Sequence, residues 1–206
     1  MAESKSVSSL EALQQLCEEC RNCGLALTRK TVVFGEGNPG AKIFLLGEAP
    51  GAQEDACGRP FVGRAGEVLD RLLAEAGLSR QDVFITGSVK CRPPHNRNPY
   101  RGELAACRPW LEKQLALIKP RVVVCLGLVA VQNILDPKAK LHEVRGRWFE
   151  GPGYWIFPTY HPAAVLRSTV KAELPIADLK AAAALSQMQP GLPPHPRPAS
   201  SGQQLI

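Results

Sequence analysis

Short apolar runs alternate along the chain with segments whose apolar residues recur at helical spacing. Such runs, rich in β-branched and aromatic residues and bounded by turn residues, are typical of strands. We expect strands at Lys42–Leu46, Val83–Val89, Arg121–Leu126 and Trp155–Pro158. The run at 121–126 is almost wholly apolar, as in a central parallel strand covered on both faces. Residues 31–34 (TVVF) are expected to be a strand or an extended segment.

Helical stripes separate these strands. Apolar residues at periods of three and four predict helices at 10–16, 65–76, 104–118, 127–135 and 174–188. Ser8 or Ser9 can cap the first helix, and Gly77 is placed to end the second. Pro109 lies inside the third, where we expect a kink or a restart. Strands alternating with helices predict an α/β fold, a three-layer αβα arrangement around a central, mostly parallel four-stranded sheet.

Length, charge and composition narrow the class of protein. A chain of 206 residues suits one well-buried domain, which we place at 1–188, followed by a disordered Pro-rich tail at 189–206. The formal net charge of +6 suits a polyanionic partner without identifying one. No apolar run approaches the roughly 20 residues of a membrane-spanning helix, and the N-terminal segment lacks the apolar core of a signal peptide. We therefore expect a protein inside the cell that does not bind membranes.

The stretch from Leu45 to Gly66 is the candidate site. A turn, Gly47 to Gly51, directly follows a predicted core strand, and no strand or helix continues through it. Glu48, Glu54, Asp55 and Phe61 lie beyond that strand. A carboxylate, a ring and exposed backbone N–H groups at the carboxyl end of a strand are what an α/β protein uses to bind a small planar ligand.

The chain has 7 cysteines, which in a reducing compartment do not form a disulfide framework. Cys20 and Cys23 form one close pair, and Cys91 and Cys107 follow far along the chain. Four thiolates brought together by the fold can hold a tetrahedral zinc ion or a [4Fe–4S] cluster, and spacing does not separate the two. Buried free thiols are the third possibility. Cys17 has the same spacing to Cys20 and can replace one of the pair, whereas Cys57 and Cys125 are interpreted as packing residues.

Several motifs, in order, resemble those of the iron–sulfur uracil-DNA glycosylases, family 4 of the uracil-DNA glycosylase superfamily. They are EAPG at 48–51 with Glu54 and Asp55, GRPFVGRAG at 58–66, VKCRPPHNR at 89–97 and PTYHP at 158–162. The match covers about Cys20 to Arg167, most of the chain. The resemblance implies a monofunctional DNA glycosylase of base excision repair. Such an enzyme hydrolyses the N-glycosidic bond of flipped-out uracil, or another deaminated base, and leaves an abasic site.

The resemblance also implies roles for individual residues. A [4Fe–4S] cluster would be bound by Cys20, Cys23, Cys91 and Cys107, and would brace the loop at Cys91 rather than do redox chemistry. Phe61 would stack on the flipped base, and His161 would donate a hydrogen bond to the base oxygen that gains charge. Glu48 would orient or activate the attacking water, while backbone N–H groups near Glu48 and Ala49 hold the base.

DNA binding is expected to rest on basic side chains near these motifs. Each would neutralise a phosphate, which makes binding strongly salt-dependent. The candidates are Lys90, Arg92 and Arg97 on the stiff loop, and Arg145 and Arg167 near the histidine segment. The segment 142–149 mixes basic and aromatic residues and is a candidate groove-contacting loop. We expect a monomer in the cytoplasm, associated with the nucleoid in a prokaryote, that binds single- or double-stranded DNA containing a damaged base.

One position departs from the family pattern. Family members usually carry Asn near the end of the second strand, where its amide pairs with the uracil edge, and the aligned residue here is Gly87. A site that lacks such a partner loses discrimination between bases. Ser88 is adjacent, but successive strand side chains point to opposite faces, so Ser88 replaces the amide only if the backbone shifts.

Two further functional classes follow from this departure and from the cysteines. The first is an iron–sulfur DNA-binding protein of the same fold with weak, altered or no glycosylase activity. The second, a small electron-transfer protein, is disfavoured because the cysteines lack compact ferredoxin spacing and the chain is basic.

Overall fold

The structure, a computed structural model, describes residues 9–188, so the predictions for the first eight residues and for the tail at 189–206 lie outside it. Within the described residues, six strands form one sheet in the order β1-β3-β2-β4-β6-β5. The strands are β1 Glu36–Gly37, β2 Ile43–Gly47, β3 Val83–Gly87, β4 Val122–Leu126, β5 Phe149–Glu150 and β6 Trp155–Thr159. The four inner strands are parallel, and β1 and β5 pair antiparallel at the two edges.

The four inner strands are those that the apolar runs predict, and the α/β class is confirmed. The prediction of a four-stranded sheet is wrong, because the two edge strands were missed. Each has only two residues, which is too short for any alternation of apolar and polar positions to be visible. Residues 31–34 are not in a strand, although the Val33 N–H donates to the Lys90 carbonyl at 2.8 Å.

The longer helices agree with the predicted stripes to within a few residues. They are α1 Leu10–Glu18, α3 Arg64–Glu75, α4 Arg101–Ile118, α5 Leu128–Ile134 and α8 Glu173–Gln187. The Ser9 hydroxyl caps α1 by accepting from the Ala12 N–H at 3.2 Å. Helix α4 continues through Pro109, so of the kink or restart expected there, the restart does not occur.

The spacing did not reveal the short helices. These are α2 Ala52–Cys57, α6 Leu141–Val144 and α7 Pro162–Leu166, with 3₁₀ turns η1 Gly24–Leu27, η2 Arg80–Asp82 and η3 Pro94–Asn96. Helix α2 lies inside the candidate-site stretch Leu45–Gly66, where no helix was predicted before residue 65. None of the helices among residues 9–188 is long and apolar enough to cross a membrane.

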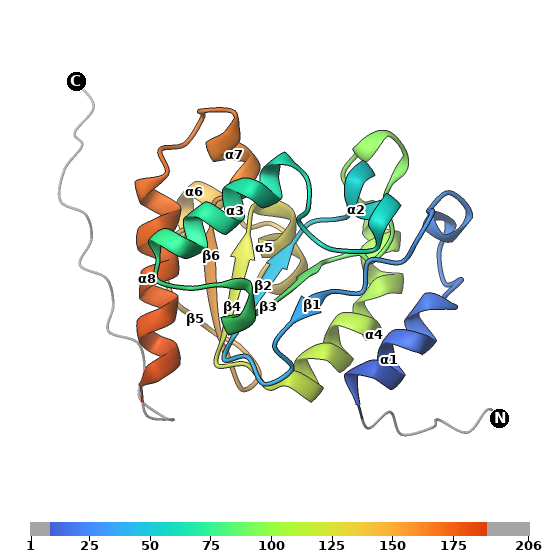
Figure 1. Ribbon diagram of the computed structural model, residues 1–206, viewed down its shortest axis with the longest axis horizontal. Helices are drawn as coiled ribbons and strands as arrows, with labels where there is room; N and C mark the ends of the chain where they lie inside the picture. Colours follow the sequence, from blue (N-terminus) through green and yellow to red (C-terminus); the bar gives the residue numbers. More distant parts are fainter. Residues whose placement is uncertain (1–8, 189–206) are drawn as a thin grey trace.

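Alternation along the inner strands divides the core in two. In β2, Ile43 and Leu45 face one side together with residues of α3 and α8, whereas Phe44 and Leu46 face the other side with residues of α1 and α4. Figure 1 shows α3 and α8 on one side of the sheet and α4 and α1 on the other. The three-layer arrangement follows, because each face of the sheet needs its own helical cover.

The order of the inner strands determines where a ligand can bind. The chain passes from β2 to β3 at one side and then returns to place β4 at the other side of β2. Such a change of direction opens a crevice beyond the carboxyl ends of the strands. The segments after β2, β3, β4 and β6 therefore converge at this edge of the sheet.

Candidate active site

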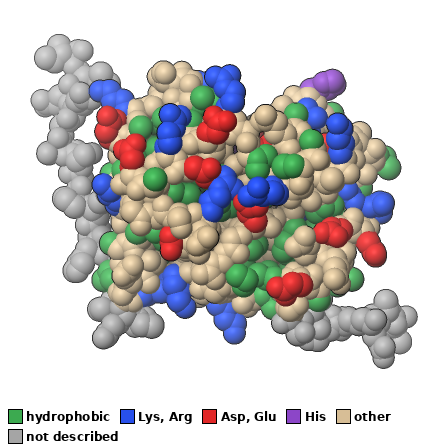
Figure 2. All heavy atoms as spheres, in the orientation of Figure 1, with side chains coloured by type: hydrophobic (Ala, Val, Ile, Leu, Met, Phe, Trp, Pro, Cys, Tyr) green, Lys and Arg blue, Asp and Glu red, His purple; other side chains and the backbone are tan. Residues whose placement is uncertain are grey.

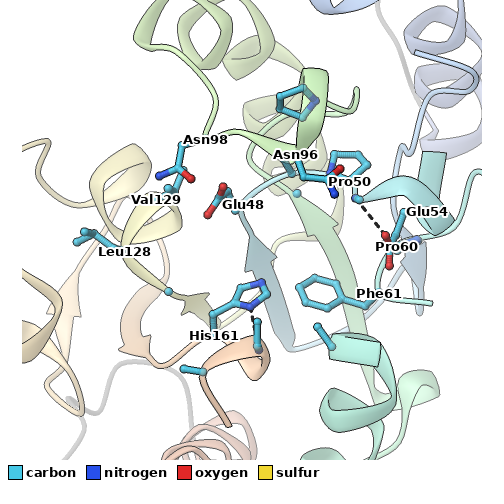
Figure 3. Close-up of a pocket in the computed structure, with 18 of the residues that line it drawn as sticks. Glu48, Pro50, Glu54, Pro60, Phe61, Asn96, Asn98, Leu128, Val129 and His161 are labelled. Atoms are coloured by element: carbon cyan, nitrogen blue, oxygen red, sulfur yellow. Dashed lines mark hydrogen bonds between the residues drawn. The ribbon is translucent and has the colours of Figure 1, made fainter. Parts of the chain in front are cut away.

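A cavity of about 670 Å³ lies at the carboxyl ends of the parallel strands, a size that suits a small organic ligand. Its lining includes residues at or just beyond the ends of all four inner strands: Glu48, Gly87, Gly127 and His161. Phe61 and Glu54 line it from the segment between β2 and α3. Figure 3 shows the Glu48 carboxylate, the His161 imidazole and the Phe61 ring around the same space. The structure thus brings together residues that are far apart in the sequence.

Phe61 is held in an unusual backbone conformation. Its φ is +53°, in the left-handed region that non-glycine residues seldom adopt, at a cost of order 1–3 kcal/mol. Arg80 holds the segment by donating hydrogen bonds to the carbonyls of Pro60 and Phe61. The ring packs over the end of β2, where a Cβ on Gly47 would lie 2.7 Å from it. A glycine is therefore required beneath the Phe61 ring.

Glu54 organises the loop that presents Phe61. One carboxylate oxygen accepts the N–H groups of Val62 and Gly63, both at 2.9 Å, and the other accepts the Gly51 N–H at 3.0 Å. These bonds join the turn after β2 to the start of α3. Asp55 is buried and accepts the Lys30 N–H at 2.9 Å, so it also serves the structure of the loop. Of the acids in this stretch, Glu48 alone is left without a hydrogen bond from the described residues.

Glu48 points into the cavity from the turn directly after β2 (Figure 3). Burial raises the pKa of its carboxyl above the ordinary value of 4.5. When ionised, the carboxylate is only partly solvated by water. Such a carboxylate can accept a proton from water or face a developing positive charge.

His161 faces Glu48 and Phe61 from the end of β6. Its Nδ1 accepts the Ala163 N–H at 3.1 Å, so in the neutral ring the proton is on Nε2. Burial, with a smaller contribution from the nearby Arg167 cation, lowers the pKa of His161 to about 4. The imidazole is thus neutral at physiological pH and offers one N–H donor to the cavity. Gly127 makes room for it, since a Cβ there would lie 3.0 Å from the His161 Cβ.

The end of β3 presents backbone and no side chain to the cavity. Gly87 lines it, and a Cβ at that position would lie 2.8 Å from the Val89 carbonyl oxygen and 3.5 Å from the Ala49 Cα. The structure contradicts a base-reading role for Ser88. Its side chain is fully buried, and its hydroxyl donates to the Gly47 carbonyl at 2.8 Å. A shift of the backbone is therefore the only way for Ser88 to reach a ligand.

A second, smaller cavity is bordered by cysteines. Cys20, Cys23, Cys91 and Cys107 line it, as does Cys17. Three of the sulfurs accept N–H groups at 3.3 Å: Cys20 from Trp110 Nε1, Cys91 from Arg29 Nη1 and Cys107 from the Lys90 N–H. No such bond reaches the Cys17 sulfur within residues 9–188, and Cys17 packs with Leu13 and Phe34 in the core. Cys125 is buried as expected, whereas Cys57 is exposed and is not a packing residue.

The donor set fits a metal centre that binds thiolates. Burial raises the pKa of Cys107 to about 11 and also raises that of Cys91, so these thiols stay protonated unless a cation binds them. N–H groups directed at sulfur are a common feature around such centres. The described part of the chain contains no group of three or more His, Cys, Asp or Glu placed to hold one metal ion.

The basic candidates differ in how they are placed. Lys90 is 1% exposed, so the structure contradicts a role in binding phosphate. Arg145 is turned inward, with its guanidinium 3.3 Å from the buried Asp178 carboxylate and only 18% of its side chain exposed. Arg97 and Arg167 line the cavity, and Arg92 lies nearby with its Nε donating to Asn96 at 2.7 Å. Figure 2 shows Lys and Arg side chains interspersed with Asp and Glu on one face, without a patch of a single sign.

Several lining residues were not predicted. Asn96 and Asn98 belong to the loop after β3, and Leu128 and Gln132 belong to α5 after β4. Leu128 could have been predicted as a lining residue, because it follows a predicted central strand just as Glu48 does. The two asparagines lie well beyond the end of β3, and only the course of the folded loop brings them to the cavity.

Comparison with known proteins agrees with this geometry. The family model described as the uracil DNA glycosylase superfamily matches residues 34–184. The chain belongs to this superfamily. A type-4 uracil-DNA glycosylase from Pyrobaculum aerophilum is 45% identical over 166 residues, which are 77% of this chain and 85% of the relative. One from Thermotoga maritima is 44% identical over 163 residues, 77% and 84% of the two chains.

Similarity extends to another branch of the uracil-DNA glycosylases. A type-5 enzyme from Thermus thermophilus is 42% identical over 118 residues, but these cover 50% of this chain and 53% of that one. The type-4 relatives match over a longer stretch, so the chain is a type-4 member of the superfamily. The family resemblance of the motifs is confirmed.

Proposed function

We propose that the protein is a monofunctional uracil-DNA glycosylase that hydrolyses the N-glycosidic bond of uracil in DNA and starts base excision repair. The observation that carries the proposal is the convergence of Glu48, Phe61 and His161 on one cavity at the carboxyl ends of the strands. The type-4 relatives named as uracil-DNA glycosylases support it. A DNA-binding protein without activity is not favoured, because all three groups needed for the reaction are present and aimed at the same space.

Each group has a step in the reaction. The nucleotide is flipped out of the helix at a cost of a few kcal/mol, and Phe61 stacks on the exposed base beside the Ala49 turn. As the bond to the sugar breaks, the uracil ring gains negative charge on its oxygen. His161 then donates its Nε2 proton in a hydrogen bond to that oxygen. A neutral donor suits this step, because it stabilises the anion without transferring a proton to it.

Glu48 acts on the sugar side. The sugar becomes cationic as uracil departs, and a carboxylate in a poorly solvated pocket stabilises that charge strongly. The same carboxylate can accept a proton from the water that attacks the sugar carbon. The products are free uracil and an abasic site, and no lysine nucleophile takes part.

DNA would be held by cations at or near the cavity: Arg167 is exposed there, Arg97 lines the cavity while its guanidinium pairs with the Glu103 carboxylate at 2.6 Å, and Arg92 is partly exposed nearby. We propose Arg92, Arg97 and Arg167 as phosphate ligands, whereas Lys90 and Arg145 are turned inward, away from DNA. The protein would act as a monomer, in the cytoplasm and at the nucleoid of a prokaryote.

Cys20, Cys23, Cys91 and Cys107 would hold a [4Fe–4S] cluster. The four thiols border one cavity, and three of them accept N–H groups. When bound, the cluster would supply structural cross-linking between the N-terminal segment, the loop after β3 and α4. Cys17 would remain a core residue beside it.

The test is product analysis on an oligonucleotide with one uracil. The proposal predicts release of free uracil and an alkali-sensitive abasic site, with no strand cleavage before alkali and no adduct after borohydride. An intact oligonucleotide after long incubation with iron-loaded protein would refute the activity. A borohydride-trapped adduct would refute the hydrolytic mechanism and leave the base specificity standing.

A further inference from the structure

Lys90 is a cation inside the protein. Its side chain is 1% exposed, and it lies between the cysteine cavity and the cavity at the strand ends. Its Nζ bonds three oxygens: Thr86 Oγ1 at 2.5 Å, Gln114 Oε1 at 2.7 Å and the Gly87 carbonyl at 2.9 Å. The next residue, Cys91, is a proposed cluster ligand.

The hydrogen bonds around Lys90 fix its charge. The Phe34 carbonyl accepts from both the Thr86 hydroxyl at 2.7 Å and the Gln114 Nε2 at 2.8 Å. Each of these side chains has therefore committed its donor to Phe34 and offers only an acceptor to Lys90. Three acceptors around one nitrogen require three N–H donors. Lys90 is therefore an ammonium ion.

A buried ammonium needs an opposite charge nearby, because removing an ion from water costs several kcal/mol. All three of its hydrogen-bond partners are neutral. Lys90 lines the cysteine cavity together with Cys91 and Cys107, and its backbone N–H donates to the Cys107 sulfur at 3.3 Å, whereas no carboxylate of residues 9–188 bonds its Nζ. The counter-charge of Lys90 therefore lies on the cysteine side.

We propose that the Lys90 ammonium is the counter-charge of the metal centre and ties that centre to the base pocket. The inference rests on the proposed [4Fe–4S] cluster, which with four thiolate ligands carries a net negative charge. The ammonium offsets part of that charge, while its bond to the Gly87 carbonyl holds the pocket end of β3. Net charge and nearby donors determine the reduction potential and retention of such clusters.

Lys90→Met tests the charge, and Lys113→Met is the matched control. Lys113 is exposed near the same centre, with its Nζ 5.6 Å from the ring of Trp110, whose N–H donates to Cys20. Both changes remove one positive charge, but water screens the exposed one. We expect Lys90→Met to lose visible cluster absorbance to a chelator faster by about tenfold or more, with a reduction potential shifted to lower values. Lys113→Met is expected to behave like the natural protein.

Gln114→Glu separates charge from packing. It keeps the shape of the side chain and places a carboxylate on the ammonium, which cancels its charge locally. We expect the same lowering of the potential as in Lys90→Met, although the lysine is intact. If Lys90→Met fails to fold, the double variant Lys90→Met/Gln114→Leu replaces it in the comparison. The second change also removes the Gln114 amide, whose oxygen would otherwise be buried without a donor.

The outcomes are distinct. Natural protein that binds no iron and sulfide on reconstitution overturns the proposed cluster itself. If the iron-loaded natural protein and Lys90→Met, or the double variant, have the same cluster retention and reduction potential, the proposed role of Lys90 is wrong. The proposed cluster is not affected by that result. An unchanged potential in folded, iron-loaded Gln114→Glu also overturns it.

Discussion

The Phe61 ring lies against the His161 imidazole, with centroids 5.6 Å apart and planes inclined by 30°. One ring belongs to the loop between β2 and α3, and the other follows β6, the last strand of the sheet. Their contact keeps water from one side of the imidazole. The same aromatic residue that would stack on the base therefore contributes to the burial that keeps His161 neutral.

Phe61→Ala is expected to raise the pKa of His161 from about 4 towards the ordinary 6.5. The cause is that water reaches the uncovered imidazole. NMR titration of the histidine ring protons measures this pKa directly. Phe61→Leu is the matched variant, because it keeps an apolar cover while losing the flat stacking face, worth roughly 1–3 kcal/mol of base binding. A His161 pKa that stays near 4 in Phe61→Ala would contradict the covering role.

His161→Gln is expected to lower the single-turnover rate by about 10²–10³-fold, the usual effect of removing one donor to a developing oxyanion.

The same substitution is expected to change how the stability of the protein depends on pH. Because the folded-state pKa is depressed, the unfolded chain binds a proton more readily between pH 6.5 and about 4.

The natural protein therefore loses stability as pH falls through that window, by about 3 kcal/mol if the full shift from 6.5 to about 4 applies. The stabilisation is fully present above pH 6.5. Denaturant unfolding at a series of pH values should show this loss in the natural protein and a smaller one in His161→Gln. Equal losses in the two proteins would show that His161 is not buried as a neutral ring.

Glu48→Gln is expected to lower the excision rate by about 10²–10⁴-fold, because the amide neither opposes the cationic sugar nor accepts a proton. In the natural protein the rate should fall on the acid side as the carboxylate is protonated, with an apparent pKa above 4.5. The Glu48→Gln profile should lack that limb. The exposed Glu75 at the end of α3 gives the control, since Glu75→Gln should keep both rate and profile. An unchanged acid limb in Glu48→Gln would assign the limb to another group.

Arg167→Ala is expected to weaken DNA binding at low salt and to reduce the slope of log K against log salt by about 1. Arg145→Ala should leave the slope unchanged and instead lower the free energy of unfolding, because it strips a partner from buried Asp178. Fluorescence anisotropy across a salt series distinguishes the two. A reduced slope in Arg145→Ala with unchanged stability would restore that residue to the DNA interface.

The inner sheet was predictable because burial on both faces forces continuous apolar runs such as VVVCL in β4. The site after β2 was predictable because parallel strands open onto a ligand at their carboxyl ends, whereas the role of His161 after β6 was predicted from the family resemblance of its motif. The edge strands could not be predicted. A strand of two residues forms only because a neighbouring strand pairs with it, and it is too short to show an alternation of apolar and polar residues.

The orientations of Ser88 and Lys90 could not be predicted either. The chain leaves the sheet at Gly87, so strand alternation no longer determines which way their side chains point. Ser88 turns its hydroxyl to the Gly47 carbonyl, and Lys90 turns inward to three acceptors. A lysine in a basic loop was interpreted as a phosphate ligand, whereas the fold uses it as a buried ion. The position of Cys17 beside the other cysteines likewise depends on tertiary packing.

The most direct test is single-turnover excision from matched oligonucleotides with uracil, hypoxanthine, xanthine or normal bases, using the natural protein, Gly87→Ala and Gly87→Asn. The account predicts uracil release by the natural protein. Both variants should be slower and less stable by about 1–3 kcal/mol, because any Cβ at position 87 meets the Val89 carbonyl. No uracil release by the natural protein, together with release by Gly87→Asn, would contradict the account and show that the chain has given up uracil recognition.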